Sequence, residues 1–376
     1  AVYGIDVKVP GMVHAALLQV PTHGGKLKSH NPEAVLGMPG VRAVVVLGPS
    51  KTKGSPVKPD TMFGIDDSYT QSGVAVIADH YWQAKRALDA LPIEWDHGAG
   101  TEWTDENKIY TAARALHSQP AEKVLHKAGD VAAVTGGKTV EAEYSTPYCE
   151  NTMMEPLNGT ALYTKDGVEV WCPTQDIRQA FWIAADETGH MPEKVKVHPT
   201  LVGGGFGRRG NSDDVRMVVA VAKEYPGVPV KVIWSREETF RQGRFRTPVI
   251  GRYKAVLDDS GYPKALTARA VFVGTKPLFH GTQNFGDVPY FLTGVIPNVE
   301  LSTSHLPMTI LNGAYRGPGY NSHAFMVETF IDECAATAGI DPLAYRLKLV
   351  SKWDKAWTDC LKVAADKSGW GTPLPK

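Results

Sequence analysis

The stretch Leu201-Val202-Gly203-Gly204-Gly205-Phe206-Gly207-Arg208-Arg209 decides the fold of this chain. It follows an apolar, strand-like run over residues 195–202 and precedes a helical pattern that begins at Asn211-Ser212-Asp213-Asp214 and runs through Tyr225. A glycine-rich turn between a strand and a helix directs backbone N–H groups and the helix N-terminus toward one point. The sequence therefore predicts an anion-binding turn, followed by a capped helix with acidic residues in its first turn. The helix should bury one apolar face: Val215, Val218, Val219, Ala222.

A second stretch, Asn312-Gly313-Ala314-Tyr315-Arg316-Gly317-Pro318-Gly319, has the same layout. It also follows a strand-like run, and it precedes a helical pattern that ends at Gly339. It is either a strand-to-helix corner with a solvated arginine, or a backbone that approaches a ligand while Arg316 donates to it. Taken together, the two loops favour a site for a large, multiply anionic cofactor. The stripe expected on this helix is Met326, Phe330, Ile331, Cys334, Ala338.

Residues 205–210 also match G-x-G-x-x-G, the fingerprint of a nicotinamide-dinucleotide site. Three features argue against that interpretation. The strand expected over 228–234 ends in Ser235-Arg236 rather than in an acidic residue that could bind a ribose. The motif lies in mid-chain, and the bulky Phe206 exceeds what a pyrophosphate turn needs. A dinucleotide-binding dehydrogenase stays the alternative, beside a tight turn without a ligand.

Bulk composition describes an ordinary globular protein. The 376 residues are enough for about two or three domains. Lys+Arg 40 balance Asp+Glu 40, which leaves no electrostatic footprint for nucleic acid or an anionic membrane. No apolar run approaches the roughly 20 residues of a membrane span, and residues 1–6 do not resemble a signal peptide. The cysteines are too far apart for a zinc or iron–sulfur motif: Cys149, Cys172, Cys334, Cys360.

The patterning along the chain predicts three parts. Residues 1–97 are expected to form a small mixed α/β domain, and residues 98–138 a polar, glycine-flanked connector with one short helix over 107–117. Residues 139–376 are expected to form a second domain, in which Asp341-Pro342 starts a helix over 343–350. The strands expected in the first domain are 13–20, 41–47, 74–78 and 92–95, with helices starting at Asn31-Pro32 and Asp79.

Segments spread over the whole chain resemble the large, molybdenum-cofactor-binding subunit of the xanthine oxidase family. They are Tyr3-Gly4-Ile5-Asp6 with the unit to Trp95, Cys149 to Pro156 with its Met-Glu-Pro tripeptide, the triple-glycine loop, 229–238, and the Ala314 to Gly319 loop. The pattern is most similar to the bacterial isoquinoline 1-oxidoreductase beta subunit and the membrane-bound aldehyde dehydrogenase large subunit. The resemblance implies an α+β fold: an α/β-hammerhead-like domain over 1–97, then the first part of a mixed α/β molybdopterin-binding domain over 139–376.

The resemblance also implies site residues. Substrate contacts fall on Arg246, Gly210 and Pro318, although a solvated basic turn is equally compatible with Arg246. Purine-oxidising members carry a glutamine, a glutamate and an aromatic residue where this chain has Cys149, Gly210 and Pro318. A thiol is a weak donor, so these departures argue against purine hydroxylation. Glu155, before a proline, is interpreted as a structural turn. The residues implied to border the cofactor are Gly204, Gly205, Phe206, Gly207, Arg208, Arg316, Gly317 and Cys149.

By resemblance the activity is hydroxylation of an aldehyde or N-heterocycle with water-derived oxygen. The implied cofactor is molybdenum-pterin cytosine dinucleotide, held through its pterin, so no protein metal ligands are expected. Electrons would pass to iron–sulfur clusters on a small partner subunit, with cytochrome c as a candidate acceptor. The family's catalytic glutamate falls beyond the point corresponding to Lys376, so the catalytic residue is unknown and this chain alone is expected to be inactive. The family favours the bacterial periplasm over the cytoplasm, and a non-catalytic scaffold subunit is a further alternative.

Overall fold

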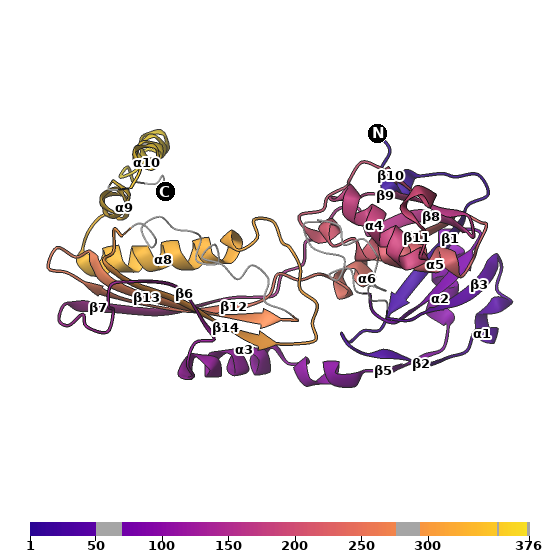
Figure 1. Ribbon diagram of the computed structural model, residues 1–376, viewed down its shortest axis with the longest axis horizontal. Coiled ribbons are helices and arrows are strands. Elements are labelled where there is room, and N and C mark those ends of the chain that lie inside the picture. The colour runs from indigo at the N-terminus through magenta and orange to yellow at the C-terminus, as the bar shows by residue number, and fades with distance from the viewer. Residues whose placement is uncertain (50–69, 276–293, 352, 374–376) are drawn as a thin grey trace. The chain divides into compact units, whose positions relative to one another are not determined.

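The structure is a computed structural model, and it describes residues 1–49, 70–275, 294–351 and 353–373. The chain divides into two compact units, each assembled from segments distant in sequence (Figure 1). The first unit comprises Ala1–Thr104, Cys149–Arg246 and Thr309–Arg316. The second comprises Asp105–Tyr148, Thr247–Met308 and Gly317–Lys376.

The first unit is built on a sheet with the strand order β10-β9-β8-β11-β1-β4-β3. Strand β1 pairs in parallel with β11, from Val13 opposite Val230 to Ala16 opposite Ile233. The strands expected in a separate domain over 1–97 therefore share a sheet with strands that follow residue 158, and the boundary expected at residue 97 is wrong. The strands are β1 (Val13–Gln19), β3 (Val41–Leu47), β4 (Gly73–Ala78), β8 (Asn158–Thr164), β9 (Gly167–Cys172), β10 (Val195–Pro199) and β11 (Val230–Ile233).

Helices cover both faces of this sheet. Successive side chains of a strand point to opposite faces, so each strand contributes to the core on both sides. Ala15 and Leu17 of β1 pack in the cluster that contains α4 (Ile177–Thr188) and α5 (Asp213–Lys223). Ala16 points to the opposite face, in the cluster with α2 (Tyr81–Ala90). Every residue of β4 is buried, as expected for a central strand covered on both sides. The smaller elements are η1 (Gly4–Asp6), β2 (Lys26–His30), α1 (Glu33–Leu36), β5 (Ile93–Asp96), η3 (Gly98–Trp103), η5 (Pro192–Lys194), η6 (Arg208–Gly210) and α6 (Arg236–Arg241).

Helix α5 confirms the apolar face predicted for it but not its cap. Val215, Val218, Val219 and Ala222 are all buried. Ser212 occupies the N-cap position with φ +51°, and its hydroxyl makes no capping hydrogen bond. The predicted side-chain cap is therefore wrong, although the acidic first turn is present.

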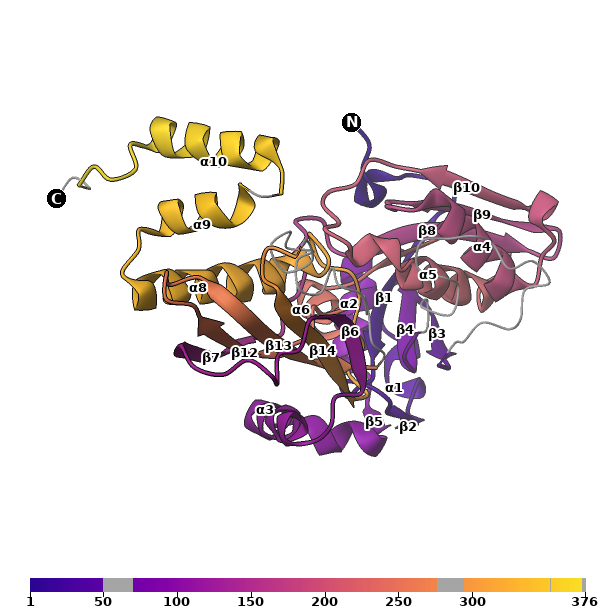
Figure 2. The same cartoon turned by 60° about the vertical axis from the view of Figure 1, so that its left-hand side comes forward.

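The second unit has a sheet with the order β6-β14-β13-β12-β7 (Figure 2). Helix α8 (Tyr320–Ala338) packs on one face, and its predicted stripe is buried apart from the half-exposed Ala338. Gly339 ends the helix with φ +71°, and Asp341 caps α9 (Pro342–Val350) by accepting from the Ala344 N–H at 2.9 Å. The strands are β6 (Lys123–Ala128), β7 (Lys138–Thr146), β12 (Val249–Leu257), β13 (Pro263–Gly274) and β14 (Asn298–Pro307).

Most of the expected connector, residues 105–138, is part of this second unit, whereas residues 98–104 belong to the first. The connector's helix α3 (Glu106–Ala115), close to the predicted span, contacts β12 and β13 and is followed by η4 (Leu116–Ser118). Strand β6, which the polar composition concealed, pairs with β14. The mixed α and β composition confirms the predicted fold class.

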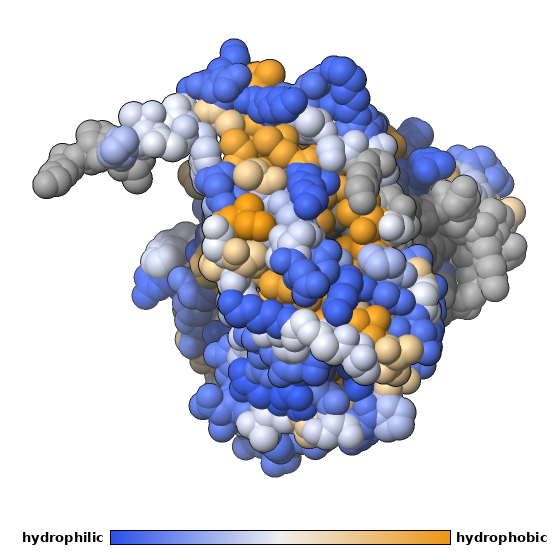
Figure 3. All heavy atoms as spheres, turned by 90° about the vertical axis from the view of Figure 1, so that its left-hand side faces the viewer, coloured by the Kyte–Doolittle hydropathy of each residue, from blue (hydrophilic) through white to orange (hydrophobic). Residues whose placement is uncertain are grey.

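The helices at the end of the second unit carry an apolar recess. Helix α10 (Lys355–Ser368) has no fully buried residue. A recess of about 440 Å³ lies between α9 and α10, lined by Leu343, Leu361 and their neighbours. Apolar side chains gather in the upper part of the face that Figure 3 shows.

Over the part of the chain that the structure describes, no helix is long and apolar enough to cross a bilayer.

Candidate cofactor-binding site

The triple-glycine turn has a backbone that needs its glycines. Gly204 and Gly207 have φ values of +101° and +102°, in the region that side chains avoid. A Cβ on Gly207 would lie 2.3 Å from the Ala314 carbonyl oxygen, and one on Gly205 would lie 2.4 Å from Gln175 Oε1. Phe206 adopts φ +52° between them and is 43% exposed. The glycines therefore have two roles. Their positive φ values make the turn possible, and their missing side chains let neighbouring segments pack closely against it.

The two predicted loops meet in the first unit. Asn151 donates through Nδ2 to the Phe206 carbonyl at 2.7 Å and to the Ala314 carbonyl at 3.1 Å. Together with the contact of Gly207 on Ala314, these bonds place the first loop against the second, two residues before Arg316. The expected meeting of the loops is present, and a side chain that the sequence did not single out joins them.

Arg208 points into the protein. Its guanidinium donates to both carboxylate oxygens of Asp213, at 2.6 and 3.0 Å, and to the Gln242 carbonyl at 3.1 Å. Arg244 reaches the same carboxylate at 3.2 Å. The Arg208 side chain is 1% exposed and committed to these partners, so it serves the fold, and its role toward a cofactor stays a prediction.

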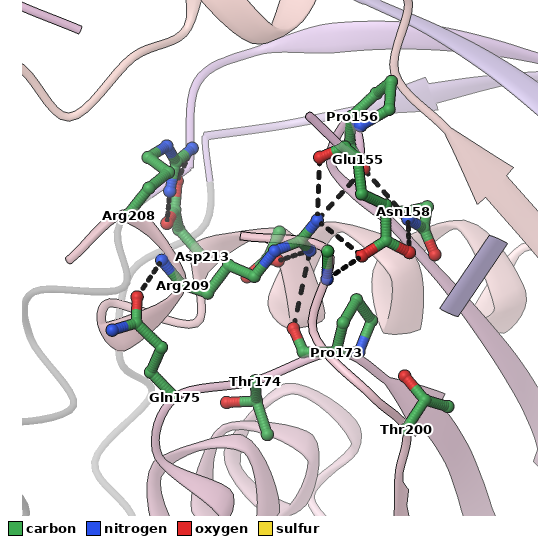
Figure 4. A network of polar contacts seen from close by, with 12 residues as sticks. Glu155, Pro156, Asn158, Pro173, Thr174, Gln175, Thr200, Arg208, Arg209 and Asp213 are labelled. Carbon is green, nitrogen blue, oxygen red and sulfur yellow. Dashed lines mark hydrogen bonds and ion pairs between the residues drawn. The ribbon is translucent and has the colours of Figure 1, made fainter. Parts of the chain in front are cut away.

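The buried Arg209 side chain holds the turn in place through hydrogen bonds and an ion pair (Figure 4). Its guanidinium donates to the carbonyls of Gly204 at 3.0 Å and Glu155 at 3.0 Å. The Glu155 carboxylate pairs with it at 3.3 Å and accepts from the N–H groups of Gly203 and Ile5. The interpretation of Glu155 as structural is confirmed, because one buried carboxylate ties the turn to the N-terminal segment.

The two aspartates at the start of α5, Asp213 and Asp214, have pKa values shifted in opposite directions. Burial alone would raise the pKa of Asp213, but Arg208 and Arg244 outweigh it and the pKa is lowered. Burial and the neighbouring Asp213 carboxylate raise the pKa of Asp214 to about 6. Asp213 is therefore the charged partner of the arginines.

Three consecutive N–H groups of the turn have no acceptor in the part of the chain that the structure describes. Within the described residues, nothing accepts from the backbone N–H of Gly204, Gly205 or Phe206, whereas Gly207 N–H donates to Gln175 Oε1 at 3.0 Å. Adjacent N–H groups of this kind suit an anionic oxygen. The turn thus fits an anionic cofactor through Gly204 to Phe206, while the Gly207 N–H is already taken.

A second group of predicted residues lies around Cys149. The backbones of Cys149 and Arg246 exchange hydrogen bonds at 3.1 and 2.9 Å. The Arg246 guanidinium lies 5.3 Å from the centre of the Tyr315 ring. A hydrogen bond between the Tyr315 hydroxyl and the Cys149 thiol raises the pKa of Tyr315, and burial adds to it. The structure therefore joins three segments here, with the thiol engaged by a phenol.

The remaining predicted residues divide by exposure. Gly210 is buried within η6 and donates to the Gly207 carbonyl, and its contact with substrate stays a prediction. Arg316 is exposed at the end of the first unit's last segment, and Gly317 and Pro318 are exposed in the segment that precedes α8.

A surface recess of about 570 Å³ adjoins the turn. Its lining is formed by Tyr3, Ile5, Asp6, Met154, Glu155, Pro156, Val202, Gly203, Gly204 and Phe206. The carboxylate of Glu155 at its edge is occupied by the contacts described above. The recess is thus mainly apolar beside a row of backbone donors.

The sheet order weakens the dinucleotide alternative. In a dinucleotide-binding βαβ unit the strands on either side of the helix lie close together in the sheet. Here β9 and β8 separate β10 from β11. The G-x-G-x-x-G match therefore lies outside that arrangement. Among the described residues, no group of three or more His, Cys, Asp or Glu side chains could hold a metal ion.

Comparison with known proteins identifies the family. The profile of the molybdopterin cofactor-binding domain matches residues 116–350. The chain therefore belongs to this family, which confirms the predicted resemblance and the molybdopterin class of cofactor.

Individual relatives agree with the family. The chain is 28% identical to the membrane-bound aldehyde dehydrogenase (pyrroloquinoline-quinone) of Gluconacetobacter polyoxogenes, over 93% of this chain and 46% of that protein. It is 25% identical to the isoquinoline 1-oxidoreductase subunit beta of Brevundimonas diminuta, over 98% of this chain and 47% of that protein. The crystal structure of quinoline 2-oxidoreductase from Pseudomonas putida 86 shares the fold, with a TM-score of 0.66 at 20% identity over 92% of this chain and 47% of that one. The chain spans about half the length of the curated relatives it matches.

Proposed function

We propose that the protein containing this chain is a molybdenum hydroxylase-type oxidoreductase, and that the chain supplies one wall of its cofactor site. The observation that carries the proposal is the contact of the two glycine loops: Gly207 lies against Ala314, with Asn151 bonded to both loops. The unengaged N–H groups of Gly204 to Phe206 and the exposed Arg316 would hold the anionic parts of the cofactor. The cofactor, in the form of molybdenum-pterin cytosine dinucleotide, supplies a two-electron oxidation with oxygen derived from water.

The proposed substrate is an uncharged aldehyde or N-heterocycle. The recess beside Phe206 is mainly apolar, which suits an uncharged molecule better than a charged one. Relatives named as an aldehyde dehydrogenase and an isoquinoline 1-oxidoreductase support the same two classes. Arg246, stacked on Tyr315, is the residue that would orient a substrate carbonyl or ring nitrogen.

The proposed partner is a small iron–sulfur subunit that takes up the electrons, with cytochrome c as the terminal acceptor. Several relatives are named as subunits, for example the molybdenum-binding subunit PaoC of Escherichia coli and the isoquinoline 1-oxidoreductase subunit beta. We place the complex in the bacterial periplasm. Fractionation of the source cells tests this location, and recovery of the protein in the cytoplasmic fraction would overturn it.

The test of the function is made on the intact protein copurified with its partner. Metal analysis, mass spectrometry of the extracted cofactor and a dye-linked assay with aldehydes and N-heterocycles give independent readouts. We expect molybdenum with a pterin dinucleotide and oxidation of one substrate class. Extraction of pyrroloquinoline quinone in place of a pterin, or tight binding of NAD, would overturn the proposal. An intact complex that binds the cofactor but oxidises neither class would favour a scaffold subunit.

The isolated 376-residue chain provides a comparison. We expect it to hold little molybdenum and to show no turnover, because general-base assistance alone contributes about 10²–10⁴-fold in rate and no base is assigned in this chain. Robust turnover by the isolated chain would show that the base lies within it.

A further inference from the structure

One peptide unit of the glycine turn is held at both of its polar ends. The Phe206 carbonyl accepts from Asn151 Nδ2 at 2.7 Å, and the N–H of the same peptide unit, on Gly207, donates to Gln175 Oε1 at 3.0 Å. The two side-chain amides come from separate segments, one before β8 and one before α4. The plane of this peptide is therefore set by two side chains that oppose each other across it.

Each of the two side-chain amides also makes a second hydrogen bond. Asn151 donates to Ala314 in the other loop, and Gln175 Oε1 accepts from the Arg209 N–H at 3.3 Å (Figure 4). The peptide is thereby fixed relative to the second loop and to the buried arginine turn. Without these bonds it could rotate, because the glycine at 207 tolerates φ of either sign. Loss of both bonds would release this end of the turn, and with it the backbone that carries the N–H groups of Gly204 to Phe206.

We propose that Asn151 and Gln175 are positioning residues for the cofactor site, which we call the amide clamp. The clamp orients the Phe206–Gly207 peptide and so presents the unengaged N–H groups of the turn to an anionic ligand. The identity of that ligand rests on the proposed function, whereas the clamp itself does not.

Asn151 and Gln175 have opposite hydrogen-bonding roles, so matched substitutions at the two positions should have different effects. Asn151 acts only as a donor toward two carbonyl oxygens, so Asn151→Asp would set a carboxylate against them. Gln175 acts as an acceptor toward two N–H groups, so Gln175→Glu keeps the bonding atom. Both substitutions preserve size and add one negative charge. A role through charge alone predicts the same response to both; the clamp predicts opposite responses.

The experiment measures hydrogen exchange of the Gly207 and Arg209 amides in the intact protein, with molybdenum content and the separate values of kcat and KM as second readouts. We expect Gln175→Ala and Asn151→Asp to speed exchange at Gly207 by about tenfold, the order expected from the loss of one or two hydrogen bonds. Gln175→Glu should stay within about twofold of the wild type, since both bonds persist. Molybdenum content should fall in Gln175→Ala and Asn151→Asp and persist in Gln175→Glu.

Two further variants separate the clamp from burial and from net charge. Asn151 is 5% exposed, so Asn151→Asp also buries a charge; Asn151→Ser removes the amide donors without one and should speed Gly207 exchange in the same direction. Gln119→Glu adds the same charge at an exposed position of the second unit and should leave Gly207 exchange unchanged.

Equal exchange at Gly207 in Gln175→Ala and the wild type would overturn the clamp, as would equal acceleration by Gln175→Glu and Gln175→Ala. Unchanged exchange in Asn151→Ser would remove Asn151 from it. If the exchange pattern appears but the wild type contains no molybdenum, the proposed function fails and the clamp stands. If the wild type contains molybdenum and the exchange pattern is absent, the clamp fails alone.

Discussion

The two glycine loops have similar sequences of glycine and arginine, and their arginines all lie in the first unit, yet these arginines differ in burial. In the first loop Arg208 and Arg209 are buried and paired with Asp213, Glu155 and Asp214. In the second, Arg316 is exposed, and the loop is held by its backbone against Phe245 and His23. The difference teaches that an arginine beside a glycine turn serves the fold wherever buried carboxylates lie within its reach. An arginine of such a turn that stays exposed can serve a ligand.

The largest effect is expected at Arg209. Arg209→Met would leave the carboxylates of Glu155 and Asp214 buried without their cationic partner and would free several carbonyls. We expect a loss of about 3–5 kcal/mol in the free energy of unfolding, measured by urea denaturation. Arg42→Met, at an exposed ion pair with Asp79, is the control and should cost far less, because solvent screens that pair. Equal losses for the two variants would mean that the inward arginine does not hold the first loop.

The contact between the loops gives the next effect. Gly207→Ala would drive a methyl group into the Ala314 carbonyl and also strain a positive φ, at a combined cost of about 3 kcal/mol. Gly227 has φ +82°, and a methyl group there would meet no atom within 4 Å, so Gly227→Ala should show only the backbone cost of about 1–2 kcal/mol. Urea denaturation of both variants isolates the close approach as their difference. A larger loss at Gly227 would contradict contact between the loops.

The comparison also shows where sequence patterns suffice. The buried faces of α5 and α8 follow from periodicity, because these helices are long and their apolar residues repeat at helical spacing. The strands β1, β3 and β4 follow from short apolar runs. The pairing of β1 with β11 could not be predicted, because a strand's pattern does not specify which distant strand it meets. The boundary expected at residue 97 was wrong for this reason.

In the site, the backbone was easier to predict than the side chains. The glycines marked both loops, because close approach and positive φ leave few alternatives. The direction of Arg208 was missed, although Asp213 five residues later was a visible partner. Asn151 and Gln175 were missed because polar residues in irregular segments look like solvent-exposed ones until the tertiary contacts are known.

Lowering the pH should weaken the hydrogen bond by which His23 holds the second loop, and so lower the free energy of unfolding. Neutral His23 accepts from the Leu311 N–H at 3.0 Å, and burial, the largest cause, lowers its pKa to about 4. Between pH 6.5 and 4 the unfolded chain binds a proton at this residue and the folded chain does not. The stability that His23 contributes is therefore present above pH 6.5 and lost as the pH falls toward 4, by up to about 3 kcal/mol. Urea denaturation across this window should show a smaller loss in His23→Gln, which keeps an acceptor but does not titrate. Parallel pH profiles for the wild type and His23→Gln would contradict this.

The smallest effect on stability is expected at the exposed arginine, and there it is most informative. Arg316→Gln removes a charge from the surface, so the free energy of unfolding should change by no more than about 0.5 kcal/mol. If the second loop presents its arginine to an anionic cofactor, the same variant should lose molybdenum during purification and show a raised apparent dissociation constant for the cofactor, because a charge-assisted hydrogen bond is lost. Arg316→Lys should recover part of the binding, since it restores the charge but not the planar donor geometry. Retention of molybdenum by Arg316→Gln at the wild-type level would show that neither loop uses an arginine for the ligand. Binding would then rest on the backbone N–H groups of Gly204 to Phe206.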